Sequence, residues 1–257
     1  MIPIYDDIRT RRRPVLTIGL ILSCVLVFLY QQTLPDDGTL GSSQAFACEW
    51  GMVPSHTLEG GDPALDIDRP GADLTCEGVN QQHNRILGLF TSQFLHGDWL
   101  HLLGNMLFLW VFGNNVEDRL GRLRFLPFYL LCGALAALVQ GITEPSSGLP
   151  LIGASGAIAG IIGGYLLLHP RAGIWTLVAM VIPVKIPAWL WGILYFGLQF
   201  LALGDASQPE GGGVAYWAHI GGLIAGLLLI RPFMAGRPED GPPPPDRALT
   251  GLAGWNR

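Results

Sequence analysis

The chain has 257 residues, of which 50% are hydrophobic and only 14% are charged. Soluble proteins carry about 25% charged residues, so this composition argues against a soluble domain and points to the lipid bilayer. The formal net charge of −5 is a weak average, and the positions of the charges say more than their sum. We expect the bilayer to be a partner of the chain and nucleic acid not to be one.

Six apolar segments approach the roughly 20 residues that a helix needs to cross a hydrocarbon core. They lie at about 15–30, 98–116, 123–142, 151–168, 187–203 and 214–234. The first segment follows a cluster of arginines and lacks a small-residue cleavage site, so it is predicted to be an anchor and not a cleaved signal peptide. The sequence thus predicts an all-α polytopic membrane protein with six transmembrane helices.

The charged residues predict how these helices are oriented. If the arginines of residues 9–13 are cytoplasmic, six spans place all other Lys and Arg on that side or at its helix ends, except Arg69 and Arg85. Acidic residues instead gather between residues 31 and 97. The expected regions are a cytoplasmic N-terminal segment at 1–14, a membrane domain at 15–234 with a long extracytoplasmic loop at about 31–97, and a Pro-rich, disordered cytoplasmic tail at 235–257.

One apolar segment does not fit the count of six spans. Residues 173–183 are too few to cross the bilayer alone. Lys185 and the two prolines beside it favour an interfacial stretch before the fifth span. This choice decides which side of the membrane the sixth span starts from.

The four cysteines fall into two groups. Cys48 and Cys76 lie in the long outer loop, where an oxidising compartment would allow a disulfide worth about 3 kcal/mol. Two unpaired thiols are the alternative. Cys24 and Cys132 lie within predicted spans and are interpreted as small packing residues.

Polar side chains inside the predicted spans are expensive in lipid, so each is a candidate functional residue. They are His96, His101, Asn105, Gln140, Ser155, Gln199 and His219. His101 and Asn105 are spaced i, i+4 and share a helical face, whereas His96 is rotated from His101 by about 140°. This rotation and the lack of an HExxH or CxxC motif argue against a metal site, and no cofactor is expected.

The predicted topology brings several of these side chains to one depth. The second, fourth and sixth spans all run from outside to inside, so Ser155, His219 and the pair His101 and Asn105 lie in the outer half of the membrane. Had residues 173–203 crossed twice, His219 would face the opposite leaflet from Ser155. The GASGA stretch around Ser155 fails the GxSxG nucleophile elbow at its last position, and no alternating strand and helix pattern surrounds it.

The spacing of small residues predicts close contact between the fourth and sixth spans. Such residues recur every four positions beside Ser155 and around His219, as Gly156, Gly160 and Gly164 and as Ala218, Gly222 and Gly226. This spacing lets two helix backbones approach closely in lipid. A serine and a histidine could then come within hydrogen-bond reach, which an activated nucleophile requires. The alternative is ordinary helix packing around a satisfied serine and a buried histidine.

Four motifs, in this order, resemble the rhomboid family of intramembrane serine proteases, in its bacterial type. They are HGDWLHLLGN at 96–105, NVEDRLGRLRF at 115–125, GASGAIAG at 153–160 and AHIGG at 218–222. The resemblance covers about residues 86–232 and implies a rhomboid-like bundle that cleaves peptide bonds in or near the transmembrane helix of a membrane-protein partner. It also implies a site that opens to the extracytoplasmic side of a bacterial inner membrane.

The same resemblance implies roles for individual residues. Ser155 is similar to the nucleophile and His219 to its general base, without an acidic third member. His101, Asn105 and the backbone N–H of Ser155 are similar to the donors of the oxyanion hole. Supporting positions are Gly153, Gly156 and His96. Glu117 is interpreted as architectural, as part of a capped helix end and an ion pair.

Two other functions are weighed against the protease. A catalytically silent relative that binds membrane clients would share the fold, but such proteins usually lack the serine or the histidine, and this chain retains both. A small transporter would need ionisable residues at mid-membrane and inverted repeats, neither of which the sequence shows.

Overall fold

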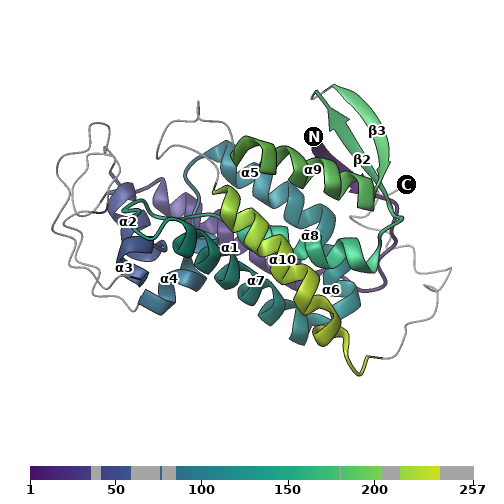
Figure 1. The fold of residues 1–257 in the computed structure, drawn as a ribbon, viewed down its shortest axis with the longest axis horizontal. Coiled ribbons are helices and arrows are strands. Elements are labelled where there is room, and N and C mark those ends of the chain that lie inside the picture. Colours follow the sequence, from purple (N-terminus) through teal and green to yellow (C-terminus); the bar gives the residue numbers. More distant parts are fainter. Residues whose placement is uncertain (36–41, 59–75, 77–84, 180, 204–214, 238–257) are drawn as a thin grey trace.

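The computed structural model describes residues 1–35, 42–58, 76, 85–179, 181–203 and 215–237. This part of the chain is mostly helical, with long helices running along the long axis of the molecule (Figure 1). The six predicted segments correspond to α1 (Val15–Gln31), the run of α5 (Trp99–Phe108), the π-helix η2 (Leu109–Gly113) and α6 (Asn114–Leu120), then α7 (Arg122–Thr143), α8 (Ser155–Leu168), α9 (Ala188–Leu203) and α10 (Tyr216–Met234). Shorter elements at one end are α2 (Ser43–Trp50), α3 (Pro54–Leu58), α4 (Arg85–Thr91) and the 3-10 turn η1 (Ser92–Phe94).

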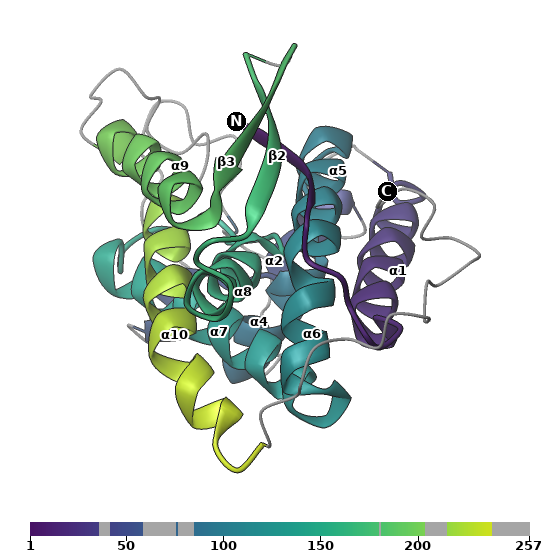
Figure 2. The same ribbon diagram turned by 90° about the vertical axis from the view of Figure 1, so that its right-hand side faces the viewer.

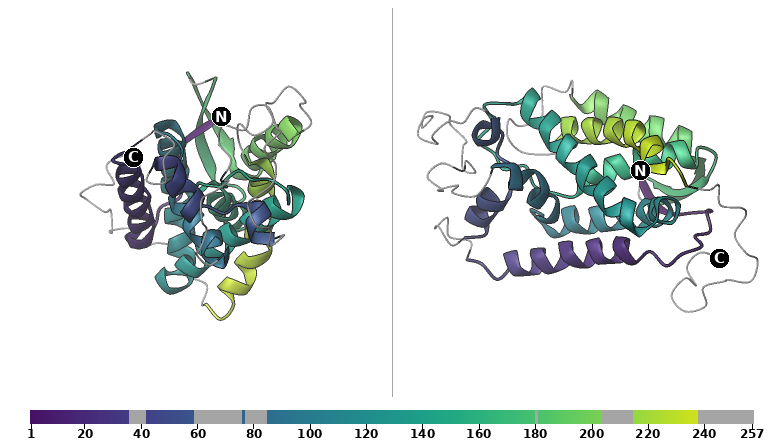
Figure 3. Two further views of the ribbon diagram at one scale, coloured as in Figure 1. Left: turned by 90° about the vertical axis from the view of Figure 1, so that its left-hand side faces the viewer. Right: turned by 90° about the horizontal axis from the view of Figure 1, so that it is seen from below.

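Helix α8 lies at the centre of the bundle. Seen from its end in Figure 2, it is surrounded by the other long helices, while α1 runs along one side of the bundle (Figure 3). Every residue from Gly156 to Tyr165 is buried. Glycines make this possible, since a Cβ on Gly163 would lie 2.5 Å from the backbone oxygen of Leu223 on α10. The small residues of α8 therefore let α10 pack directly against its backbone.

The outer surface of the bundle is apolar. Two of the described helices, α7 and α10, are long and apolar enough to cross a membrane, and α1, α8 and α9 are apolar but shorter. Large aliphatic side chains are exposed on all of the long helices, for example Leu26 at 65%, Leu100 at 82%, Leu198 at 57% and Leu228 at 69%. A soluble bundle instead turns polar side chains outward, so this surface suits contact with hydrocarbon.

A three-stranded sheet corrects the all-α fold that the sequence predicts. β1 (Ile2–Asp6) pairs antiparallel with β2 (Gly173–Val178), which pairs antiparallel with β3 (Ile182–Pro187). β-branched side chains recur at every second position of β2, at Ile174, Thr176 and Val178, and this pattern favours a strand. The hairpin of β2 and β3 projects away from the helices (Figure 2). The segment between α8 and α9 is thus a hairpin and does not run through the bundle.

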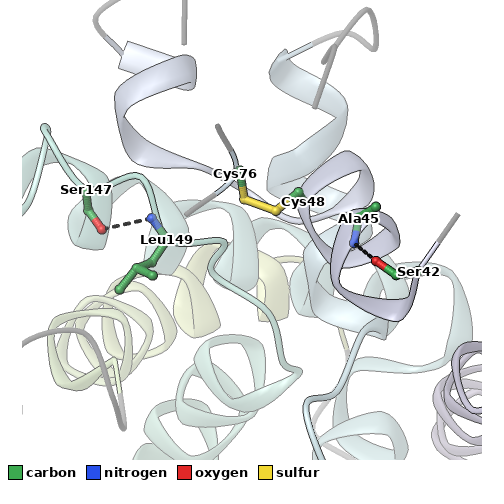
Figure 4. The surroundings of a disulfide bond; sticks show 6 residues. All are labelled: Ser42, Ala45, Cys48, Cys76, Ser147 and Leu149. Atoms are coloured by element: carbon green, nitrogen blue, oxygen red, sulfur yellow. Dashed lines mark hydrogen bonds between the residues drawn. A yellow bond between two sulfur atoms is a disulfide. The ribbon is translucent and has the colours of Figure 1, made fainter. Parts of the chain in front are cut away.

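A disulfide joins Cys48 of α2 to Cys76, which decides between the two states that the sequence left open (Figure 4). The two Cα atoms are 5.4 Å apart, and the cysteines are separated by 28 positions in the sequence. Both are buried together with Val53 in a small cluster. Cys24 and Cys132 are free and fully buried, in agreement with a packing role.

Two adjacent carboxylates of α6 hold the chain at the start of α1. Glu117 accepts hydrogen bonds from the backbone N–H groups of Leu16 at 3.0 Å and Thr17 at 2.7 Å, and from the Thr17 hydroxyl at 2.8 Å. Asp118 accepts hydrogen bonds from the backbone N–H groups of residues 11 and 12. The first N–H groups of a helix have no partner within it, and a carboxylate satisfies them well. Glu117 therefore caps a neighbouring helix instead of forming the predicted ion pair.

Asp6, at the end of β1, ties the sheet to the bundle. Its Oδ2 accepts a hydrogen bond from Asn115 Nδ2 at 2.8 Å and another from the hydroxyl of Tyr165 on α8. The side chain is only 5% exposed, and this burial raises the pKa of Asp6 to about 7. The N-terminal strand is thus held by a carboxyl group that changes its protonation near neutral pH.

Candidate active site

Ser155 is the first residue of α8, so its hydroxyl and backbone N–H lie at a helix N-terminus. The turn before it depends on Gly153, whose φ of 122° is a conformation that only glycine adopts readily. A Cβ on Gly153 would lie 2.7 Å from His101 Nε2 and 3.8 Å from Ser155 Oγ. Gly153 therefore leaves the space in which the imidazole ring and the serine hydroxyl approach each other.

Helix α5 supplies the two candidate oxyanion donors. The helix begins where the Asp98 carboxylate accepts a hydrogen bond from the backbone N–H of His101 at 2.8 Å. The His101 ring lies against Gly153, beside the serine. Asn105 is one turn further on and 7% exposed, and its Nδ2 donates to the backbone oxygen of His101 at 3.0 Å. The structure thus brings His101 to the serine, whereas the Asn105 amide is bonded within its own helix.

His96 packs against His101. The two rings meet edge to face with their centroids 5.2 Å apart. His96 is 1% exposed, and neither of its ring nitrogens has a hydrogen-bond partner. Within the described residues, no group of three or more His, Cys, Asp or Glu side chains could hold a metal ion. The structure therefore gives the histidine pair an edge-to-face packing contact.

His219 lies in the first turn of α10 and is 9% exposed. Next to it, Ala218 faces α8, and a Cβ on Gly156 would lie 3.8 Å from the Ala218 backbone oxygen. One turn further along α10, a Cβ on Gly222 would collide with the backbone oxygen of Gly156. The neighbours of Ser155 and His219 are therefore in direct contact across two helices, as the spacing of small residues predicts.

Two glutamines hold the first turn of α10 from different helices. The Nδ1 atom of His219 lies 2.6 Å from Oε1 of Gln199 on α9. On α7, Oε1 of Gln140 accepts a hydrogen bond from the backbone N–H of Ala218 at 3.1 Å. Ser155 and His219 both lie in the part of the chain that the structure describes, and the serine hydroxyl does not form a hydrogen bond with the histidine ring. The cost of amides in lipid marked both glutamines in the sequence, but no pattern there linked Gln199 to His219.

A small cavity lies beside Ser155. Its volume is about 10 Å³, close to the space that one water molecule requires. Ser92, Gln93 and Ala218 contribute to its wall along with Ser155. The Oε1 atom of Gln93 is buried without a hydrogen-bond partner, so the wall contains an acceptor that a water molecule could satisfy.

The fold and the site define a helical bundle with an apolar outer surface and a half-buried serine at the start of its central helix. Residues 83–235 match the family model described as the rhomboid domain. This match covers more than half of the chain, and the chain therefore belongs to the rhomboid family. Members of this family are integral membrane proteins, and proteolysis within the membrane is known in it.

Three similar proteins come from a plant, a yeast and a bacterium. RHOMBOID-like protein 5 of Arabidopsis thaliana is 30% identical over 149 residues, which are 56% of this chain and 44% of the relative. Rhomboid protein 1, mitochondrial, of Saccharomyces cerevisiae is 32% identical over 146 residues, 55% of this chain and 40% of the relative. Rhomboid protease GlpG of Salmonella newport is 25% identical over 231 residues, 88% of this chain and 66% of the relative. The chain thus spans less than half the length of the first two relatives.

Proposed function

We propose that this chain is an intramembrane serine endopeptidase that cleaves peptide bonds in or near the transmembrane segments of other membrane proteins. The observation that carries the proposal is that the His101 ring and the Ser155 hydroxyl approach each other at Gly153. Ser155 begins α8, and α8 packs directly against α10, the helix that bears His219. A protease among the relatives supports the same reaction class.

In the proposed reaction, Ser155 Oγ attacks the carbonyl carbon of the scissile bond while His219 Nε2 takes the hydroxyl proton. The negative charge that forms on the carbonyl oxygen is stabilised by the backbone N–H of Ser155, His101 and Asn105. When the C–N bond breaks, His219 gives its proton to the leaving amine. Water then attacks the resulting ester, with His219 as base, to release the new carboxylic acid and restore the serine.

The resting structure differs from the reacting one in two contacts. Asn105 donates to its own helix, and His219 is not bonded to Ser155. Catalytic hydrogen bonds are often long or misaligned without substrate and tighten when substrate binds. We propose that the substrate carbonyl takes the Asn105 amide from its intrahelical partner.

The proposed arrangement in the membrane has six spans, with both termini in the cytoplasm and the site opening on the opposite side. Aliphatic side chains exposed on α1, α5, α7, α9 and α10 support a ring of lipid-facing helices around the central α8. Met52 pairs with Leu151, just before α8, so the end of the molecule with the disulfide is also the end with Ser155. Disulfides persist in oxidising compartments, which supports an extracytoplasmic site.

The proposed domain limits follow from the same arrangement: an N-terminal segment at 1–14, a membrane domain at 15–234 and a tail at 235–257. The relatives do not identify one cellular membrane as the location of this protein. Relatives include plant proteins and a yeast mitochondrial protein, and the comparisons therefore do not favour a bacterial inner membrane over others.

The experiment is cleavage of a single-span model substrate by the purified chain in detergent micelles, followed by mass spectrometry of the products. Wild type is compared with Ser155→Ala, His219→Ala and the matched control Ser23→Ala, in which an exposed serine of α1 loses a hydroxyl that bonds only to Gly19 of its own helix. Wild type and Ser23→Ala should cut at the same bond, and the other two variants should not cut. Persistent cleavage by Ser155→Ala would eliminate the proposed reaction.

A second candidate is a catalytically silent rhomboid-like protein that binds membrane clients. The lack of a hydrogen bond between Ser155 and His219 favours it. A silent protein would retain the intact substrate during affinity purification, with no difference between wild type and Ser155→Ala. An active one retains intact substrate only in the Ser155→Ala variant.

A further inference from the structure

The hydrogen bond between His219 and Gln199 restricts the state of the imidazole ring. A carboxamide oxygen can only accept, so the 2.6 Å contact between Gln199 Oε1 and His219 Nδ1 places the ring proton on Nδ1. The nitrogen left with a free electron pair is then Nε2. That is the atom that a general base needs when it takes a proton from a serine.

Packing on α9 holds the Gln199 side chain toward α10. The phenol of Tyr195, one turn earlier, lies beside Gln199. Its ring stacks on the fully buried Trp191, with centroids 4.7 Å apart and planes 13° apart. Residues on the opposite side of α9, such as Ile193 at 62%, are exposed. The Gln199 amide is thus the polar group on a face of α9 that is otherwise aromatic and turned toward the bundle. A polar side chain is costly within the membrane, so its presence there indicates a function.

We propose that Gln199 is a positioning residue that holds His219 in the tautomer and orientation required of a general base. This inference rests on the proposed function, because it assigns Gln199 a part in that same site. In serine proteases with three catalytic side chains, an aspartate fixes the histidine tautomer. A neutral amide performs the same orientation here without placing a second charge in the bilayer, where a carboxylate is expensive.

Among the described side chains, only that of Gln199 forms a hydrogen bond with the His219 ring. His101, from α5, is the ionisable side chain that interacts electrostatically with His219. Gln140, from α7, uses its oxygen for the backbone N–H of Ala218. Among the described residues, Gln199 is therefore the group that fixes the proton on Nδ1.

The first measurement is nitrogen NMR of the full chain with ¹⁵N-labelled histidine in micelles, in which His219 is identified by its loss in His219→Ala. We expect the Nδ1–H tautomer in wild type and in Gln32→Met, a matched change of an exposed glutamine at the end of α1. Gln199→Met keeps the side-chain length but has no amide oxygen, and the ring should shift toward the Nε2–H tautomer. An unchanged tautomer in Gln199→Met would overturn the proposal, whatever the enzyme activity.

The second measurement is the pH dependence of substrate cleavage. Gln199→Met should lower kcat about 10-fold with little change in KM, a size expected for loss of one hydrogen bond that acts in the reaction. Gln199→Glu restores an acceptor, so it should recover most of kcat. It should also move the acidic limb of the profile to higher pH, because a carboxylate stabilises the protonated ring.

The outcomes separate this inference from the proposed function. Cleavage by Ser155→Ala would remove the function and leave the tautomer result standing as a structural fact. Loss of cleavage in Ser155→Ala, together with a wild-type profile in both Gln199→Met and Gln199→Glu, would remove the role of Gln199 alone. If Gln199→Met does not fold, an unshifted acidic limb in Gln199→Glu is sufficient to overturn the inference.

Discussion

Gly156 tests how closely α7 and α8 must pack behind the serine. A Cβ added by Gly156→Ala would lie 2.7 Å from the Cβ of Ala136 on α7. Two carbon atoms pack at about 3.5 to 4.0 Å. The helices must therefore separate by about 1 Å, and the residue that moves is the neighbour of Ser155.

The expected effect is larger on activity than on stability. Overpacking of this kind costs about 1–3 kcal/mol, whereas a shift of about 1 Å in a reacting group can reduce a rate about 100-fold. We therefore expect Gly156→Ala to fold with a lowered thermal unfolding temperature and to cleave a single-span substrate about 100-fold more slowly. Both quantities are measured on the same detergent-purified sample.

The matched control is the double variant Ala136→Gly with Gly156→Ala, which moves the methyl group from one helix to the other. It should recover a large part of the lost activity, because the close contact between the two Cβ atoms no longer exists. Ala136→Gly alone should cost about 0.5–1 kcal/mol in stability and leave cleavage measurable. Wild-type cleavage by Gly156→Ala, or a double variant no better than Gly156→Ala, would refute the reasoning.

Three further predictions concern contacts outside the site. Glu117→Gln keeps the size of the side chain but removes the charge that caps α1, and it should lower the free energy of unfolding by about 1.5–3 kcal/mol; an unchanged thermal melt would contradict this. Burial raises the pKa of Asp6 to about 7 from its ordinary value of 3.8, so the docking of β1 is strongest when the carboxyl is protonated and weakens as the pH rises between these values. Hydrogen exchange of the β1 amides, corrected for intrinsic rate, should therefore be faster at pH 8 than at pH 5, and Asp6→Asn should show no such difference. Reduction of the Cys48–Cys76 disulfide should lower stability by about 3 kcal/mol in wild type and have no effect in Cys48→Ser, as a thermal melt with and without reductant would show.

The long helices could be predicted from the sequence because apolar length is a local property. Each predicted segment contains a helix in the structure, with ends that differ by a few residues. The sheet could not be predicted in the same way. The pairing of β1 with β2 joins Ile2 to Leu177 and Asp6 to Ile174. Partners so far apart in the sequence leave no local pattern in either segment. The apolar character of residues 173–183 was visible, but the partner strand at the N-terminus was not.

The candidate site shows the same division between local and long-range information. Small residues at a spacing of four predicted the contact between α8 and α10, and the space at Gly153 lies where the serine motif begins. The bond from His219 to Gln199 depends on how α9 is rotated about its own axis. Most residues of α9 are apolar on every side, so its sequence does not reveal which face meets α10. The bond of the Asn105 amide to the backbone of its own helix is a choice of side-chain rotamer, which the sequence does not reveal either.

The central claim is that Ser155 is made nucleophilic by His219. Treatment of the purified protein with a fluorophosphonate, followed by peptide mapping in a mass spectrometer, tests this most directly. The account predicts a covalent phosphonate on Ser155 in wild type and its loss in His219→Ala. Modification of a different serine, or equal labelling of Ser155 in both proteins, would contradict it.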